Sequence, residues 1–392
     1  MKIKLFLPLL VVFILVLVYL LWPPQVPISP LCTSSANAPE KCLQIQSNLG
    51  DTHAQSFTIL GFAPYWNLKK LTSDSLSHIT HFAYFALHLT SSGQLQTHVN
   101  RRELEPGYLN YTRLLNSNPS DKPLLLTFLP QDQSALTSIL SSSSTRLAAI
   151  QTMLTALQQS RAQGVNIDFE PTGDTPPSLR ADFTLFIQAL HSQLVSNNYH
   201  LSISIYPSAG SRPRLWDLSA LAPLTDHFVI MTYDYTMPLS PRAGPNSPLR
   251  DMGGSFEHNI VKNIAEISQV IDSRQILLGI PFYGYEWDTE NDAKYAPTLS
   301  RGSVASFERI QQMLNDQTLS LLWDRNSLTA YGTSTSSGVT SQIYFDNEQS
   351  LRLKLDFVRS ANLGGIAIWA LGYDNSVPWL WPTINSLNDP VK

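Results

Sequence analysis

Residues 164–170, GVNIDFE, alternate apolar and polar side chains over the length of one buried β-strand. Side chains on an extended strand point alternately to opposite faces, so Asn166, Asp168 and Glu170 share one face. The apolar residues between them suit a face that packs against helices. The polar face is therefore predicted to point toward the axis of a barrel, with Glu170 nearest the end where the strand finishes.

Eight apolar runs of this kind, rich in β-branched and aromatic residues, alternate with longer segments of helical spacing. Segments 145–162 and 178–197 show that spacing most clearly and are predicted to be amphipathic crossover helices. Several runs are apolar at nearly every position, as in parallel strands covered on both faces. The pattern predicts an α/β fold, a TIM (β/α)8 barrel. The eight runs are 57–62, 79–86, 124–128, 164–170, 201–206, 228–233, 276–282 and 365–369.

The interval 288–343 is too long for a single crossover and contains its own helical and β-like pieces. It is predicted to be a small α+β insertion between strands seven and eight of a catalytic barrel spanning 56–388. Because it follows the carboxyl end of a barrel strand, it is expected to form one wall of a substrate groove.

The first 22 residues predict an N-terminal transmembrane helix. Lys2 and Lys4 precede an uncharged apolar run, 5–22, long enough to cross a bilayer. The lysines favour a cytoplasmic N-terminus, with the rest of a single-pass protein outside the cytoplasm. Residues 23–55, rich in Pro and Ser, read as a linker. The alternative is secretion after signal cleavage, since 36–38 has a small-x-small pattern.

Composition excludes several function classes. Charged residues make up 14% of the chain and the net charge is −4, so nucleic acid is not an expected partner. The only cysteines, Cys32 and Cys42, lie in the linker, where both a disulfide and two free thiols remain open. No cofactor is predicted. No metal site is predicted either, since His78 and His81 lack acidic or cysteine neighbours in sequence and the acidic run 288–292 lacks the pattern of a calcium loop.

Asp168 and Glu170 are the main candidates for chemistry. Two neighbouring carboxylates cannot both ionise freely, so one pKa rises and a proton donor becomes available near neutral pH. Cleavage of a glycosidic bond requires such a donor. The alternative is that these residues only cap the strand. Burying two carboxylates and an amide together is costly without a function, which favours catalysis.

Several motifs together resemble glycoside hydrolase family 18. Gly164, Asp168 and Glu170 match its strand-four signature D-G-x-D-x-D-x-E. Four ordered matches on predicted strands are far more specific than any one of them. The insertion, with residues 343–350, is most similar to the branch of spore-germination and cortex-lytic N-acetylglucosaminidases. The further matches are 231–234 for the Met-x-Tyr-Asp motif, 243–249 for the loop after it, 278–284 for strand seven and 364–369 for strand eight.

The resemblance implies a retaining, substrate-assisted mechanism without an enzyme nucleophile. Glu170 would protonate the glycosidic oxygen while the 2-acetamido carbonyl of the sugar attacks the anomeric carbon. Asp168 would hold the acetamide nitrogen and Tyr233 its oxygen. The implied substrate-binding residues are Asn166, Met231, Asp234 and Trp369, the last as an aromatic floor.

Two positions depart from the signature: Gln163 and Asn166 replace its first two aspartates. An amide at 166 cannot share a proton with Asp168, so Asn166 is expected to orient Asp168 by hydrogen bonding. The expected activity is hydrolysis of β-1,4 linkages in an N-acetylglucosamine polymer, either chitin or peptidoglycan. The alternatives are a carbohydrate-binding, lectin-like barrel that has lost catalysis and a membrane-tethered scaffold.

Overall fold

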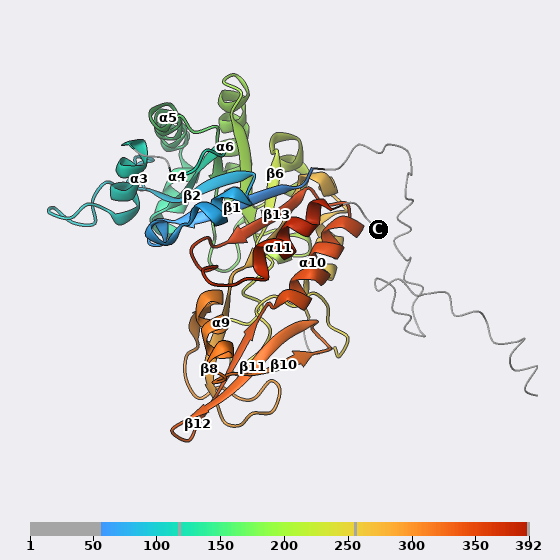
Figure 1. Cartoon of the computed structure of the whole chain (residues 1–392). Coiled ribbons are helices and arrows are strands. Elements are labelled where there is room, and N and C mark those ends of the chain that lie inside the picture. The colour runs from blue at the N-terminus through green and yellow to red at the C-terminus, as the bar shows by residue number, and fades with distance from the viewer. Residues whose placement is uncertain (1–55, 117–118, 255–256, 390–392) are drawn as a thin grey trace, which may run out of the picture. The chain divides into compact units, whose positions relative to one another are not determined.

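The computed structural model describes residues 56–116, 119–254 and 257–389. Eight parallel strands form a closed barrel in the spatial order β1, β13, β7, β6, β5, β4, β3, β2 (Figure 1). The predicted (β/α)8 barrel is therefore confirmed. Its strands are β1 (Thr58–Pro64), β2 (His81–Leu89), β3 (Leu124–Pro130), β4 (Gly164–Ile167), β5 (His200–Ile205), β6 (His227–Ile230), β7 (Ile276–Pro281) and β13 (Gly365–Trp369).

The strand that decided the fold is shorter than predicted, because β4 ends at Ile167. The following residues leave the ladder after one more bond, from the Asp168 amide to the Phe128 carbonyl at 3.0 Å. The two faces are as expected: Phe169 is buried and stacks on Phe186 of α6 (Pro177–Val195) with ring centroids 5.4 Å apart. Only glycine fits at position 164, where the strand begins, since a Cβ atom there would lie 2.4 Å from the His200 carbonyl oxygen.

Helices cover the outside of the barrel, and two of them match the predicted crossover helices: α5 (Ser143–Ser160) and α6. Polar side chains define several helix starts. Asn347 and Ser350 form a reciprocal capping box at α10, which satisfies amide groups that the helix leaves unpaired. The other helices are α2 (Ser73–Ser77), α3 (Pro106–Asn116), α4 (Gln133–Ser141), α7 (Leu218–Leu221), α8 (Ile260–Ile267), α9 (Phe307–Asn315), α10 (Glu348–Ser360) and α11 (Leu380–Asn385), with 3₁₀ turns η1 (Leu68–Lys70), η2 (Pro207–Gly210), η3 (Ala222–Leu224), η4 (Ser273–Gln275) and η5 (Ser386–Asn388).

A second sheet of five strands lies in the chain between β7 and β13, in the order β10, β11, β12, β8, β9. Together with α9 it projects to one side of the barrel (Figure 1). Its first strand begins at Tyr283, only two residues after β7 ends, which is earlier than the expected start of the insertion at 288. The strands are β8 (Tyr283–Thr289), β9 (Ser303–Ser306), β10 (Ser320–Asp324), β11 (Thr329–Ser336) and β12 (Val339–Phe345).

At the N-terminal end of the barrel, His81, His200 and His227 each occupy the first position of their strand. Nε2 of His200 lies 3.1 Å from Nδ1 of His227, and the rings of His81 and His200 are 6.2 Å apart. Asp226 lies 3.4 Å from Nδ1 of His200. These four residues are called the histidine cluster below.

The predicted transmembrane helix, the linker and both cysteines lie outside the described residues. From residue 56 onward, among the residues described, no helix has the length and hydropathy needed to cross a membrane.

Candidate active site

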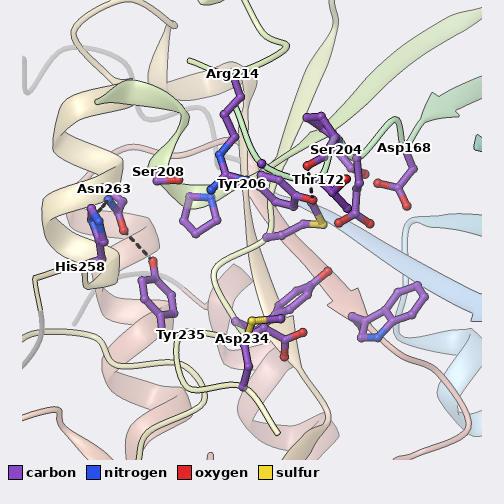
Figure 2. A pocket seen from close by; sticks show the side chains of 18 of the residues that line it. Asp168, Thr172, Ser204, Tyr206, Ser208, Arg214, Asp234, Tyr235, His258 and Asn263 are labelled. Carbon is purple, nitrogen blue, oxygen red and sulfur yellow. Dashed lines mark hydrogen bonds between the residues drawn. The ribbon is translucent and has the colours of Figure 1, made fainter. Parts of the chain in front are cut away.

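A cavity of about 770 Å³ opens at the carboxyl ends of the barrel strands. Figure 2 shows Asp168 on one side and His258, Asn263 and Ser208 on the other, with Tyr206 between them and Asp234 below the centre of the view. Barrel active sites occupy this position. Six of the residues predicted from sequence line the cavity: Asp168, Glu170, Met231, Tyr233, Asp234 and Trp369.

Asp168 is the least solvated acid of the site, with 5% of its surface exposed. Burial, reinforced by the charge of Glu170, raises its pKa well above the usual range. Its Oδ1 atom has no hydrogen-bond partner among the described residues. An unpartnered buried polar atom is costly, so a group of the substrate is its natural partner.

Glu170 follows Asp168 by two residues, is exposed and lines the cavity. Although water reaches it, surrounding protein atoms desolvate its carboxyl group and raise its pKa. A hydrogen bond from Tyr206 opposes this rise and the charge of Asp234 adds to it. Glu170 thus combines access to substrate with a pKa raised toward the range useful for proton donation.

Tyr233 lies just past the end of β6, where the chain leaves the sheet in two tight turns. In these turns the amides of Thr232 and Tyr233 each donate to the carbonyl two residues earlier, at 2.8 Å. Its ring needs the glycine of β7, since a Cβ on Gly279 would lie 2.9 Å from it. Burial raises the pKa of Tyr233 well above its usual value, and the charge of Asp168 adds to this rise. The hydroxyl therefore stays protonated and can donate a hydrogen bond into the cavity.

Asp234 adopts a left-handed backbone conformation with φ of 61°, which is unusual outside glycine. The surrounding structure holds it there. Its amide donates to Asn246 at 2.9 Å, and its carboxylate accepts from Tyr283 and from Tyr285, the latter at 2.9 Å. Burial raises the pKa of Asp234, while the two tyrosine hydroxyls oppose that rise.

The insertion therefore supports the site from behind, because Tyr283 and Tyr285 belong to β8. No residue from 283 to 345 is among the described residues that line this cavity, which corrects the expectation that the insertion forms its wall. Its first strand begins immediately after β7, so its tyrosines lie against the barrel rim rather than over the opening.

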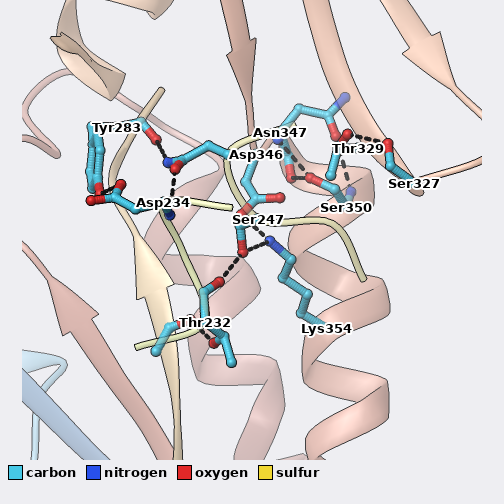
Figure 3. Close-up of polar contacts among 12 residues, drawn as sticks. Thr232, Asp234, Ser247, Tyr283, Ser327, Thr329, Asp346, Asn347, Ser350 and Lys354 are labelled. Carbon is cyan, nitrogen blue, oxygen red and sulfur yellow. Dashed lines mark hydrogen bonds and ion pairs between the residues drawn. The ribbon is translucent and has the colours of Figure 1, made fainter. Parts of the chain in front are cut away.

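A buried ion pair joins α10 to the residues just before it (Figure 3). Lys354 of α10 and Asp346 form it, and both side chains are at most 2% exposed. Nζ of Lys354 also donates to Oγ of Ser247 at 2.7 Å, and Ser247 in turn donates to the Thr232 carbonyl at 2.5 Å. This chain of bonds connects α10 to the turn that carries Tyr233.

Trp369 ends β13 and forms part of an aromatic surface in the cavity. Its ring packs edge-on against Phe85 at 4.6 Å and lies 6.0 Å from the ring of Phe62. Met231 lines the same cavity although it is only 9% exposed. Such an aromatic face suits the apolar face of a sugar ring.

Asn166 is placed differently from the other predicted residues, since it is fully buried and does not line the cavity. Its amide donates to Ser204 at 3.0 Å and accepts from Ser202 at 2.8 Å. The hydrogen bond expected from Asn166 to Asp168 is absent among the described residues. Two serines of β5 compete for the amide, a contact that the sequence of β4 alone cannot reveal.

The sequence analysis missed Tyr206 and Arg214. Tyr206 follows β5, and its hydroxyl lies close to both Glu170 and the Pro171 carbonyl, the latter at 3.3 Å. Arg214 places its guanidinium 5.0 Å from the centre of the Tyr206 ring. Tyr206 could have been found from its place as the last residue of the predicted strand 201–206, while nothing in the sequence marks Arg214.

No group of three or more potential ligand side chains within the described ranges is arranged to hold a metal ion. His78 was predicted to lack an acidic neighbour, but its Nε2 atom lies 3.3 Å from the carboxylate of Asp74, four residues earlier.

The sequence model of the family described as "Glycosyl hydrolases family 18" matches residues 58–374. The chain belongs to this family. Its members are glycosidases, and the matched range contains every residue of the cavity named above. The family resemblance drawn from the strand motifs is thereby confirmed.

Relatives in this family share modest identity with the chain. The Bacillus subtilis protein YdhD, whose assigned name is that of a sporulation-specific glycosylase, is 26% identical over 55% of this chain and 49% of its own length. The di-N-acetylchitobiase of Homo sapiens is 22% identical over 53% of this chain and 57% of its own. The chain thus spans about half the length of these two relatives.

Solved structures agree on the fold. A class V chitinase from Nicotiana tobaccum superimposes with a TM-score of 0.74 at 18% identity, covering 86% of this chain and 99% of the other. An N-acetylglucosaminidase of family 18 from Paenibacillus barengoltzii gives 0.69 at 19% identity, covering 85% and 100%.

Proposed function

We propose that the protein hydrolyses β-1,4 linkages in polymers that contain N-acetylglucosamine, with retention of configuration and with Glu170 as the general acid. The observation that carries this proposal is the pairing of accessible Glu170 with buried Asp168, whose Oδ1 atom lacks a partner among the described residues. Relatives named chitobiases and chitinases support the substrate class.

In the first step, Glu170 gives its proton to the glycosidic oxygen as the bond to the anomeric carbon breaks. The carbonyl oxygen of the 2-acetamido group attacks that carbon and forms an oxazolinium-like ring. Asp168 accepts a hydrogen bond from the acetamide nitrogen and stabilises the positive charge, while the Tyr233 hydroxyl donates to the acetamide oxygen. Water then attacks the anomeric carbon and returns a proton to Glu170, which restores the acetamide and the acid.

Trp369 provides the platform that fixes the sugar ring over these groups, and Asp234 lies beside it as a polar contact. Positioning matters because the attacking oxygen belongs to the substrate, so the rate depends on holding the acetamide in the attacking conformation. The raised pKa of Glu170 supports its role, since the acid must enter the reaction protonated.

The test is release of a chromophore from glycosides of N-acetylchitooligosaccharides by residues 56–392, compared with Glu170→Gln. We expect the variant to lose about 10²–10⁴-fold in kcat, the range that one positioned general acid contributes. Thr172→Ala, on the same rim of the cavity, is the matched control and should retain activity. Equal turnover by wild type and Glu170→Gln would remove Glu170 from the mechanism.

A sugar-binding protein without catalysis is the second candidate function, and the presence of Glu170 argues against it. Binding of chitooligosaccharides without turnover by the wild type would favour that alternative. The same assay with chitin and with purified peptidoglycan compares the two polymers.

We also propose that the chain is a single-pass membrane protein with its barrel outside the cytoplasm, on the basis of the apolar run 5–22 after two lysines. Fractionation of cells that express the full chain tests this. The protein should sediment with membranes, and removal of residues 1–22 should release it. Recovery from the medium of a product shortened at its N-terminus would instead indicate secretion after signal cleavage.

A further inference from the structure

The catalytic cavity contains one feature that hydrolysis of a neutral sugar polymer does not use. Among the described residues that line it, Arg214 is the only lysine or arginine. It lies between η2 and α7, on the loop after β5, and Figure 2 shows it on the side of the cavity away from Asp168 and Asp234.

The positive charge of Arg214 is not matched by the protein. Its Nε is buried and has no hydrogen-bond partner, and no carboxylate within the described part of the chain forms an ion pair with it. The neighbouring Arg212, in contrast, is paired with Asp174. Arg214 as a whole is half-exposed and lines the cavity, so the guanidinium, rather than the enclosed Nε, is the group that can meet an anion of the ligand.

The backbone and the neighbouring ring hold this arginine in place. Arg214 has a φ of 45°, in the left-handed region that few non-glycine residues adopt, and Arg180 donates to its carbonyl at 2.7 Å. The guanidinium also lies over the Tyr206 ring, a favourable cation–π arrangement. Residues held in such conformations concentrate at functional sites, where the surrounding structure maintains them.

Tyr206 fixes where along the substrate this charge acts. Its hydroxyl lies beside Glu170, which protonates the scissile oxygen, and its ring lies under the guanidinium. The charge is therefore separated from the reaction centre by a single aromatic side chain.

We propose that Arg214 binds a carboxylate carried by the substrate, and that the polymer is an acidic one in which N-acetylglucosamine alternates with a sugar bearing a 3-O-lactyl group whose carboxylate is free, as in peptidoglycan glycan strands from which the stem peptides have been removed. This proposal rests on the proposed function and assigns its substrate class. Chitin offers the guanidinium no anionic partner. A carboxylate matches the planar fork of arginine and can accept two parallel hydrogen bonds from it.

The other charges in the cavity restrict where that carboxylate can bind. Besides Arg214 and His258, the described lining residues include four with carboxyl groups: Asp168, Glu170, Asp234 and Glu257. Those of them that are ionised would repel an acidic group, whereas Arg214 is the only lysine or arginine among the described lining residues that can attract one. The arginine thus selects both the polymer and its register relative to Glu170.

The experiment compares kcat/KM for three substrates: chitotetraose, peptide-free glycan strands with free lactyl carboxylates, and the same strands with those carboxylates methyl-esterified. Arg214→Met should lose about 10–100-fold on the acidic strands, as expected for a hydrogen bond to a charged group, and less than about twofold on the two neutral substrates. Arg214→Lys should recover part of the loss, and Arg212→Met should match wild type on all three.

Two outcomes would overturn the assignment while leaving the proposed function intact. One is an equal loss on neutral and acidic substrates, which would mean that Arg214 acts only by supporting Tyr206. The other is a wild-type enzyme that cleaves chitotetraose and not the acidic strands. If the wild type cleaves neither polymer, the proposed function fails. Calorimetric binding of the acidic strands to Glu170→Gln with and without Arg214→Met then tests the contact directly, and equal affinities would refute it.

Discussion

The two ends of the barrel both bury titratable groups, but with opposite chemistry. At the C-terminal end, burial raises the pKa values of Asp168, Glu170 and Asp234. At the N-terminal end, burial lowers those of His81 and His200, and it lowers the pKa of His227 to about 4. In both places the low polarity of the surroundings disfavours the charged form.

The ends differ in how well these groups are satisfied. His200 bonds to His227 and has Asp226 beside it, and His81 bonds to Thr80. Asp168, in contrast, leaves one oxygen without a partner among the described residues. The N-terminal end is therefore organised for stability, and the C-terminal end keeps an unmet hydrogen-bonding group for its ligand. Acidification should affect the two ends with opposite sign.

Loss of the buried Lys354–Asp346 ion pair should cause the largest drop in the free energy of unfolding. Lys354→Met would leave Asp346 buried without its cation, and Oδ1 of Asp346 already lacks a partner among the described residues. We expect a loss of about 3–5 kcal/mol in the free energy of unfolding, measured by urea denaturation. The pKa of Lys354 is itself lowered by burial, which Asp346 opposes.

The control for this variant is the double substitution Lys354→Met with Asp346→Asn, which removes both charges. It should recover much of the lost stability, because the uncompensated carboxylate is gone. If the single and double variants are equally unstable, packing of the lysine stem rather than the ion pair supports the turn at Tyr233.

The contrast between the ends also explains what sequence could predict. Strand periodicity places the apolar and polar faces of residues 164–170 correctly, since alternation depends only on local geometry. The family motifs locate Asp168, Glu170, Tyr233 and Trp369 at strand ends. Contacts that cross the barrel follow from closure and are not encoded locally.

Asn166 illustrates that limit, because its partners are serines on the neighbouring strand rather than Asp168 two residues away. Tyr283 and Tyr285 illustrate it further, since they reach Asp234 only once the insertion begins directly after β7. Arg214 has no sequence signal at all, and only the fold places it over Tyr206.

The histidine cluster at the N-terminal end should make the free energy of unfolding depend on pH. The folded-state pKa of His227 is lowered to about 4, below its unfolded value, so its neutral form contributes stability at pH 7 that is lost as the pH falls from about 6.5 toward 4. We expect the wild type to lose on the order of 2–3 kcal/mol over this range from this group. Urea denaturation at several pH values measures it.

His227→Gln provides the comparison, since it cannot gain a proton. Its stability should depend less on pH between 6.5 and 4 than that of the wild type, while kcat at neutral pH stays unchanged. His200 faces His81 and Asp226 as well, so some pH dependence will remain in the variant. Parallel pH profiles for the two proteins would show that the histidine cluster is not the acid-sensitive element.

The C-terminal end should respond in the opposite direction. The pKa of Asp168 is raised in the folded state, so the stability that this group contributes is present below about pH 4 and is lost as the pH rises through its folded value. Asp168→Asn should therefore raise the free energy of unfolding at pH 7 by about 1–2 kcal/mol, with no gain below pH 4. Activity should fall at the same time, and a less stable variant at pH 7 would contradict this account.

The smallest effect concerns Tyr206, whose hydroxyl stabilises the ionised form of Glu170 and so opposes the rise in its pKa. Removing that hydroxyl in Tyr206→Phe should raise the pKa further and keep Glu170 protonated to higher pH. The alkaline limb of kcat/KM on a neutral chitooligosaccharide should move up by about 0.3–1 pH unit, equivalent to one hydrogen bond.

Tyr235→Phe is the matched control, because Tyr235 lines the same cavity but its hydroxyl donates to Oδ1 of Asn263, at 3.0 Å, rather than to Glu170. Its alkaline limb should coincide with that of the wild type. A downward shift of the alkaline limb in Tyr206→Phe would mean that the hydroxyl favours the protonated form of Glu170. The contrast in pKa shifts between the two ends of the barrel would then depend on burial alone, without a contribution from Tyr206, the residue whose ring also contacts Arg214.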